Sequence, residues 1–196
     1  MSDVSKITVP NGSSAVTYDL KDSRAETALA HVIDSGPKNM INAQNPSGQQ
    51  RVTITNESNG AVNISCTDAK WATATYIVPI TPYVRYTFKL YVDSATLSNV
   101  TFMCFINASE NGSDMGEITR TTITTAPTST MCTVNTQYSE LKIGVNINNS
   151  ATSGSGSATV RLMLCPEEVF DITSKYIPYR PSYDELVARI TALENT

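Results

Sequence analysis

The sequence is poor in the side chains that catalysis most often uses. It has one histidine, His31, and a nucleophilic triad built on Ser or Cys needs a histidine base. No partner motif surrounds His31, so we expect an ordinary residue of a short helix. The four cysteines are widely spaced, form no C-x-x-C pair and sit in apolar or strand-like runs. This pattern predicts buried free thiols rather than disulfides or a metal site.

Positive charge and long apolar runs are also lacking. The chain has 14 Lys and Arg against 18 Asp and Glu, a net charge of -4, and no basic cluster. Nucleic-acid-binding proteins neutralise phosphates with such clusters, so we exclude this class. No run of about 18 apolar residues occurs, so we expect no membrane insertion. The start, MSDVSKITVP, lacks the apolar core of a signal peptide, so we expect no export leader.

What the sequence has in excess is Thr, Ser and Asn. Thr favours strands, and Ser and Asn favour turns. From residue 50 onward, polar turns separate nine segments that alternate like strands: RVTITN, AVNISC, ATYIVPI, VRYTFKLYV, NVTFMCFIN, EITRTTIT, TMCTVN, ELKIGVNIN and ATVRLMLC. Nine strands of this length and spacing predict an all-β fold, a jelly-roll β-sandwich, which we assign to residues 37–178.

The segment VRYTFKLYV, residues 84–92, has apolar side chains at its even-numbered positions, Val84 among them, and mixed ones at the others. This alternation predicts a strand with one core face and one solvent face. Tyr83, Arg85 and Tyr91 would then share the solvent face of one strand.

Residues 1–36 form a smaller N-terminal piece. Two β-like runs, 6–9 and 15–20, flank an NGSS turn and predict a hairpin. Asp22 can cap a helix that Gly36 and Pro37 end. The piece has too few apolar residues to fold alone, so we expect it to attach to its own domain or to another chain.

Residues 179–196 have the pattern of a C-terminal helix. Ser182 and Glu185 have the spacing of a capping box. Four apolar residues then follow at the spacing of a coiled coil: Tyr183, Leu186, Ile190 and Leu193. An isolated helix of this length is marginal in water, so its stripe needs a partner. Either the helix folds back on the sandwich, or identical helices associate, and we expect this second role, oligomerisation.

Three strings carry a resemblance to phage and prophage tail proteins. VTYDLKDSRA resembles the Y-D-(I/L)-K-D-x-x-A-R segment near the N-termini of tail, baseplate and fibre proteins, with Arg24 and Ala25 in reverse order. GPKNMIN resembles the KNLL start of their sandwich domains, and RLMLCPEEVFDITSKYIPYRPSYDELVARITALE resembles their ending, in which a last strand leads through Y-x-P-Y to a short helix. The middle, residues 42–157, is similar in general pattern to jelly-roll carbohydrate-binding modules.

This resemblance implies a virion tail component of the receptor-binding type. Such proteins are often homotrimers, and they contact other phage tail proteins and host-surface glycans. Sugar binding needs aromatic rings that stack on sugar faces and polar groups that bind hydroxyls. The best candidates are Trp71, in the polar turn TDAKWATA, together with Tyr83, Arg85 and Tyr91. Each also has a structural explanation, Trp71 as a lid over the core edge and the tyrosines as ordinary exposed sheet residues.

Carboxylates offer two further possibilities. Glu110, Asp114 and Glu117 in the loop ASENGSDMGE could hold a calcium ion, although they lack the spacing of a defined calcium loop. We expect no other cofactor. Glycoside hydrolysis needs two carboxylates about 5–9 Å apart, and no pair can be placed together from the sequence. We therefore expect no enzymatic activity.

The sequence leaves three functions open. We expect a non-enzymatic phage tail-tip or fibre component that binds host-surface glycans. The alternatives are a purely structural spacer of a fibre or baseplate and a bacterial carbohydrate-binding domain.

Overall fold

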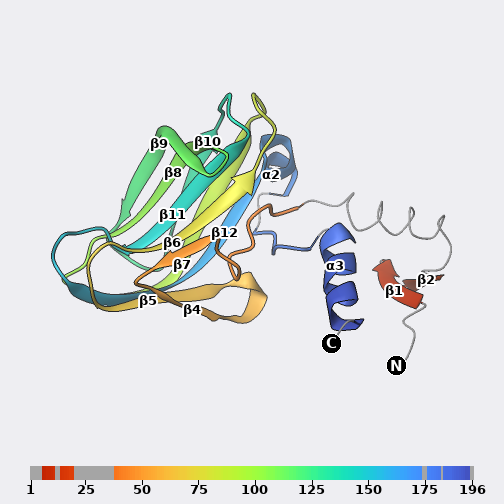
Figure 1. The fold of residues 1–196 in the computed structure, drawn as a ribbon, viewed down its shortest axis with the longest axis horizontal. Coiled ribbons are helices and arrows are strands. Elements are labelled where there is room, and N and C mark those ends of the chain that lie inside the picture. Colours follow the sequence, from red (N-terminus) through yellow and green to blue (C-terminus); the bar gives the residue numbers. More distant parts are fainter. Residues whose placement is uncertain (1–5, 12–13, 20–37, 174–175, 182, 195–196) are drawn as a thin grey trace. The chain divides into compact units, whose positions relative to one another are not determined.

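The computed structural model describes residues 6–11, 14–19, 38–173, 176–181 and 183–194. The chain divides into two compact units: Asn39–Tyr179, and a smaller one made of Met1–Lys38 and Arg180–Thr196. In the larger unit, two five-stranded antiparallel sheets pack face to face (Figure 1). This arrangement confirms the predicted all-β jelly-roll sandwich.

The two sheets have the strand orders β10-β7-β12-β5-β4 and β3-β6-β11-β8-β9, and all their strand pairs are antiparallel. We refer to them as the β7 sheet and the β11 sheet. Their strands are β3 (Gly48–Gln50), β4 (Thr53–Asn56), β5 (Val62–Ala69), β6 (Ala72–Pro79), β7 (Tyr86–Ser98), β8 (Phe102–Glu110), β9 (Ser113–Ile123), β10 (Thr128–Val134), β11 (Glu140–Asn148) and β12 (Gly154–Pro166). A one-turn 3-10 helix, Ser58–Gly60, joins β4 to β5, and α2 (Glu167–Thr173) follows β12.

Most consecutive strands belong to different sheets, so the chain turns a corner between them at each end of the sandwich. Among the described strands of the sandwich, only β4–β5 and β8–β9 are consecutive strands that are neighbours in one sheet. The loops that connect the strands therefore lie at the two ends of the sandwich. The candidate site lies at one of these ends.

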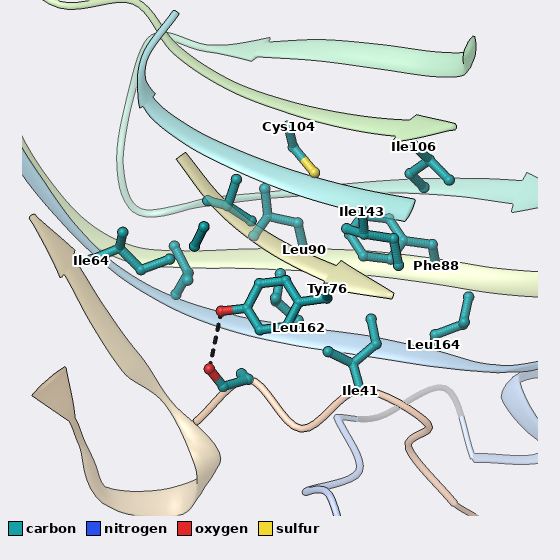
Figure 2. Close-up of a cluster of buried hydrophobic side chains, with 14 of the residues drawn as sticks. Ile41, Ile64, Tyr76, Phe88, Leu90, Cys104, Ile106, Ile143, Leu162 and Leu164 are labelled. Atoms are coloured by element: carbon teal, nitrogen blue, oxygen red, sulfur yellow. Dashed lines mark hydrogen bonds between the residues drawn. The ribbon is translucent and has the colours of Figure 1, made fainter. Parts of the chain in front are cut away.

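The core fills the space between the sheets, because alternate side chains of each strand point inward. In β6 the buried positions alternate with half-buried or exposed ones from Ala72 to Pro79. Figure 2 shows apolar side chains of both sheets meeting, among them Ile64, Phe88, Leu90, Ile106, Ile143 and Leu162. The hydroxyl of Tyr76 donates a 3.0 Å hydrogen bond to the carbonyl oxygen of Ala43, so this buried polar group is satisfied.

The nine predicted strand segments correspond to β4–β12, and the structure differs from the prediction at several points. The three-residue strand β3 and the helix α2 were not predicted, and β12 begins at Gly154, four residues before the predicted segment ATVRLMLC. The strand β7 begins at Tyr86 rather than Val84, and Val84 is 37% exposed. The prediction that Val84 faces the core is therefore wrong, because the alternation starts two residues later.

The smaller unit contains the predicted hairpin and C-terminal helix. The strands β1 (Lys6–Asn11) and β2 (Ser14–Asp19) pair antiparallel, and α3 spans Tyr183–Glu194. The expected helix after Asp22, with His31, lies outside the described residues, and so does the capping residue Ser182.

All four cysteines are free thiols, as predicted, and Cys132 alone among them is only partly buried. Burial raises the pKa of each thiol, that of Cys165 to about 11. Among the described residues, no helix combines the length and apolarity needed to cross a membrane.

Candidate functional site

Trp71 lies at the corner where β5 ends and β6 begins, and its side chain is 46% exposed. Because β5 belongs to the β7 sheet and β6 to the β11 sheet, the chain changes sheets within Lys70 and Trp71. The backbone N–H of Trp71 donates a 3.3 Å hydrogen bond to the carbonyl oxygen of Ser150, in the loop between β11 and β12. The corner is thus held against a second loop with the indole partly open to solvent.

An open depression of about 500 Å³ lies at this corner. It is lined by Arg51, Thr67, Asp68, Ala69, Lys70 and Ser153. The Nη1 of Arg51 donates a 2.9 Å hydrogen bond to the carbonyl oxygen of Lys70, which ties the β3–β4 connection to the corner. The Oγ of Ser155 accepts a 3.0 Å hydrogen bond from the N–H of Asp68. Three segments distant in sequence therefore build one polar surface, which we call the Trp71 corner.

The backbone of the Trp71 corner adopts left-handed conformations at three residues that are not glycine. The φ angles are +56° for Arg51, +45° for Asp68 and +52° for Trp71. Asp tolerates this region, whereas a long or bulky side chain there is uncommon and costs free energy. Strained positions are concentrated at functional sites in proteins, which makes the corner a candidate for one, although Tyr83 at the other end of β6 has the same kind of conformation.

A buried asparagine connects two segments of the corner by hydrogen bonds. Asn148 is fully buried, and its Nδ2 donates hydrogen bonds to the carbonyl oxygens of Ala69 (2.7 Å) and Thr152 (2.9 Å). These bonds hold the end of β5 to the β11–β12 loop, whereas the Oδ1 of Asn148 has no hydrogen-bond partner among the described residues.

The structure does not place the other sugar-binding candidates beside Trp71. Tyr83 and Arg85 lie in the loop after β6, whereas Trp71 precedes it, so the eight residues of β6, about 26 Å of strand, separate them. Both residues also precede β7, which starts at Tyr86, so the prediction that they share one strand face with Tyr91 is wrong. Tyr83 is 74% exposed with φ +64°, and Arg85 pairs with Glu167 of α2 at 2.8 Å.

Tyr91 does lie on the outer face of β7, but its ring is engaged by protein groups. The ring of Tyr176 meets it edge to face at 5.6 Å, and the guanidinium of Arg161 lies 5.1 Å from both ring centroids. The ammonium of Lys89 lies 4.8 Å from the Tyr91 ring, and Arg161 also pairs with Asp93 at 2.6 Å. A sugar would have to displace these cations to stack on Tyr91.

The three calcium candidates are not brought together. Glu110 accepts hydrogen bonds from the N–H and hydroxyl of Ser139, Asp114 accepts one from the side chain of Asn107, and Glu117 pairs with Arg120. Among the described residues, no three His, Cys, Asp or Glu side chains converge as metal ligands. The geometry therefore gives the calcium hypothesis no support.

The outer face of the β11 sheet carries a second feature, which the sequence analysis missed. The ring of Phe105 lies over Gly144, where an added Cβ would be 2.0 Å from Cε1. On either side of this pair along the face, the Oδ1 atoms of Asn107 and Asn146 are buried without a hydrogen-bond partner among the described residues. The signal was present in FMCFIN, where Phe105 and Asn107 alternate with the core residues.

The four residues proposed for oligomerisation belong to α3. Leu186 and Ile190 are half-buried, Leu193 is 76% exposed, and the side chain of Tyr183 lies outside the described part of the structure. The helix exists as predicted, and its role in association stays a prediction.

No protein-family model and no curated protein matches the sequence. Among solved structures, a CBM4 carbohydrate-binding module aligns with 62% of this chain and 91% of its own, at 16% identity and a TM-score of 0.43. The C-terminal CBM6 of a marine laminarinase from Zobellia galactanivorans aligns with 63% of this chain and 96% of its own, at 16% identity and a TM-score of 0.43.

The enzymatically active domain of tailspike protein 4 of bacteriophage CBA120 is also similar. It aligns with 65% of this chain but 21% of its own, at 13% identity and a TM-score of 0.45. With TM-scores below 0.5, these similarities assign neither a family nor a function to this chain.

Proposed function

We propose that this chain is a non-enzymatic glycan-binding protein and that the Trp71 corner is its binding site. The observation that carries the proposal is a half-exposed tryptophan next in the chain to a polar depression lined by Arg51, Asp68 and Lys70. An indole can pack on the apolar face of a sugar, while the guanidinium, carboxylate and ammonium groups hydrogen-bond its hydroxyls.

A glycan array with two matched variants tests the proposal. Trp71→Asn and Tyr83→Asn each remove an exposed aromatic side chain from a left-handed position, and Asn tolerates that conformation. The two positions lie at opposite ends of the sandwich. We expect Trp71→Asn to abolish glycan signals and Tyr83→Asn to retain them. If Trp71→Asn binds as the wild-type protein does, the Trp71 corner is not the site.

We further propose that the protein is a component of a phage tail tip or fibre, works as a homotrimer, and contacts other tail proteins and a host-surface glycan. The support is the resemblance of VTYDLKDSRA and of the C-terminal segment to tail proteins. Mass spectrometry of purified particles, produced by induction of the encoding strain, should detect the chain. Its absence from every particle fraction would favour a bacterial carbohydrate-binding domain instead.

One observation favours the structural alternative, a spacer module. The edge strands β9 and β10 carry Met115 and Met131, which are 45% and 56% exposed. An exposed edge can pair with another protein. Substitution of both methionines by Lys should leave glycan binding unchanged if the Trp71 corner is the functional site, and should block particle assembly if the edge is.

A further inference from the structure

The charged side chains of the Trp71 corner form no ion pairs with the residues that the structure describes. Arg85, Arg120 and Arg161 each form an ion pair with a carboxylate, whereas Arg51, Asp68 and Lys70 form none with any described residue. Two cations and one anion line the depression, so its charge is +1 in a chain whose net charge is -4. The net charge of the protein repels anions, whereas the local excess of positive charge in this depression attracts them.

The backbone at Arg51 has a conformation that is uncommon for a long side chain. Arg51 has φ +56°, a conformation that Gly or Asn adopts with less strain. Its Nη1 is fixed by the carbonyl oxygen of Lys70, so the guanidinium is directed to the corner and its other N–H groups stay available for a ligand. Among the described residues, the guanidinium of Arg51 therefore has N–H groups that a ligand can use.

We infer that the Trp71 corner selects an anionic saccharide, one that carries a carboxylate or phosphate group. This inference rests on the proposed function. Arg51 and Lys70 bind the anionic group, because charge-assisted hydrogen bonds are the strong ones and a guanidinium fits carboxylate or phosphate oxygens. Asp68 accepts hydrogen bonds from ring hydroxyls, which the same sugar unit supplies. Trp71, next in the chain to Lys70, offers its ring to the apolar face of the sugar.

Calorimetric titration with matched saccharides tests this selectivity. The probes are oligogalacturonate and its methyl ester, which differ in charge, and a phosphorylated oligosaccharide with its dephosphorylated form. We expect at least one anionic member to bind about 10-fold or more tightly than its neutral counterpart, since a hydrogen bond to a charged group contributes about 1.5–3 kcal/mol. The pair with the larger ratio identifies the anionic group. Raising the salt concentration should weaken that binding.

Single substitutions test whether the charges of Arg51 and Lys70 cause the preference for an anionic ligand without a change in the stability of the fold. Arg51→Asn and Lys70→Gln should each remove about 10-fold of the preference for the anionic ligand. Arg51→Asn should unfold close to the wild-type temperature, because Asn relieves backbone strain and the lost hydrogen bond to the carbonyl oxygen of Lys70 is exposed to water. Lys142→Gln, on the outer face of β11, is the control and should change nothing.

The outcomes distinguish the inference from the function on which it rests. If neutral and anionic members bind equally and Trp71→Asn removes both, the corner binds glycans and the inferred selectivity is wrong. If no anionic saccharide binds while a neutral one does, the selectivity is wrong as well. If no saccharide in the titrations or on the array binds, the proposed function fails together with the inference.

Discussion

At the scale of single residues, Gly144 is the position where a small change has the clearest consequence. It lies buried in β11 beneath the ring of Phe105, and a Cβ there would be 2.0 Å from Cε1. We expect Gly144→Ala to lower the free energy of unfolding by about 1–3 kcal/mol, because the ring must move to relieve the overlap. Chemical denaturation measures this change.

Gly48→Ala is the matched control for that substitution. Gly48 lies in β3, and its added Cβ would be 4.0 Å from the Cβ of Thr75, an ordinary contact. We expect the free energy of unfolding to stay the same or to rise by less than about 1 kcal/mol. Equal losses in both variants would contradict the packing of Phe105 on Gly144.

The buried thiols predict how stability depends on pH. Burial raises the pKa of Cys165 from 9.0 to about 11. Above pH 9 the unfolded chain loses this proton while the folded chain keeps it, so the free energy of unfolding falls as the pH rises towards 11. Below pH 8 this thiol is protonated in both states and adds no pH dependence.

Cys165→Ala isolates the contribution of one thiol. Denaturation of the variant and of the wild-type protein from pH 8 to 11 should give a shallower alkaline decline for the variant. Parallel curves would show that Cys165 does not contribute to the decline.

At the scale of elements, the side chain of Asn39 supplies hydrogen bonds to the backbone of β12 beyond Val160, where the pairing of β12 with β5 ends. Its Nδ2 donates to the carbonyl oxygen of Leu162 (2.7 Å), and its Oδ1 accepts from the N–H groups of Leu164 and Ile41 (both 3.0 Å). Asn39 is 2% exposed, so removing its side chain leaves buried backbone groups unpaired.

We therefore expect Asn39→Ala to lower the free energy of unfolding by about 2–4 kcal/mol. Asn42→Ala is the control, because the Oδ1 of Asn42 accepts one exposed bond from the N–H of Gln44. Urea denaturation of both variants checks the difference. A loss of less than about 1 kcal/mol for Asn39→Ala would mean that water replaces these bonds.

Elements with strong alternation could be predicted from the sequence, and those set by their neighbours could not. RVTITN and ELKIGVNIN alternate clearly and became β4 and β11. The strand β3 has the sequence GQQ, which has no strand propensity and forms only because β6 offers a free edge. Helix α2 begins directly after a strand that ends in proline, and its only local signal is two glutamates in the first turn.

At the scale of the whole molecule, the candidate site shows the limit of sequence reasoning. Trp71 could be proposed from its polar turn, but Arg51 is 20 residues away from it along the chain and Ser153 is in another loop. Their meeting depends on which strands share an end of the sandwich. The same topology separates Tyr83 and Arg85 from Trp71, although all three are close in sequence.

The C-terminal helix gives a prediction for the assembled molecule. The a and d positions of α3 suit helix association, and a 12-residue helix is marginal alone. Light scattering after size exclusion should give the mass of a trimer for the full chain and of a monomer for a chain that ends at Pro181. The same mass for both chains would mean that α3 does not associate the subunits.

Tryptophan fluorescence tests the central claim, that a glycan binds at the Trp71 corner, most directly. Trp71 is the only tryptophan, so the emission of the protein reports on this site alone. A glycan that binds the wild-type protein in calorimetry should shift or quench the emission with the same dissociation constant. Calorimetric binding with an unchanged emission spectrum would place the ligand elsewhere and contradict the account.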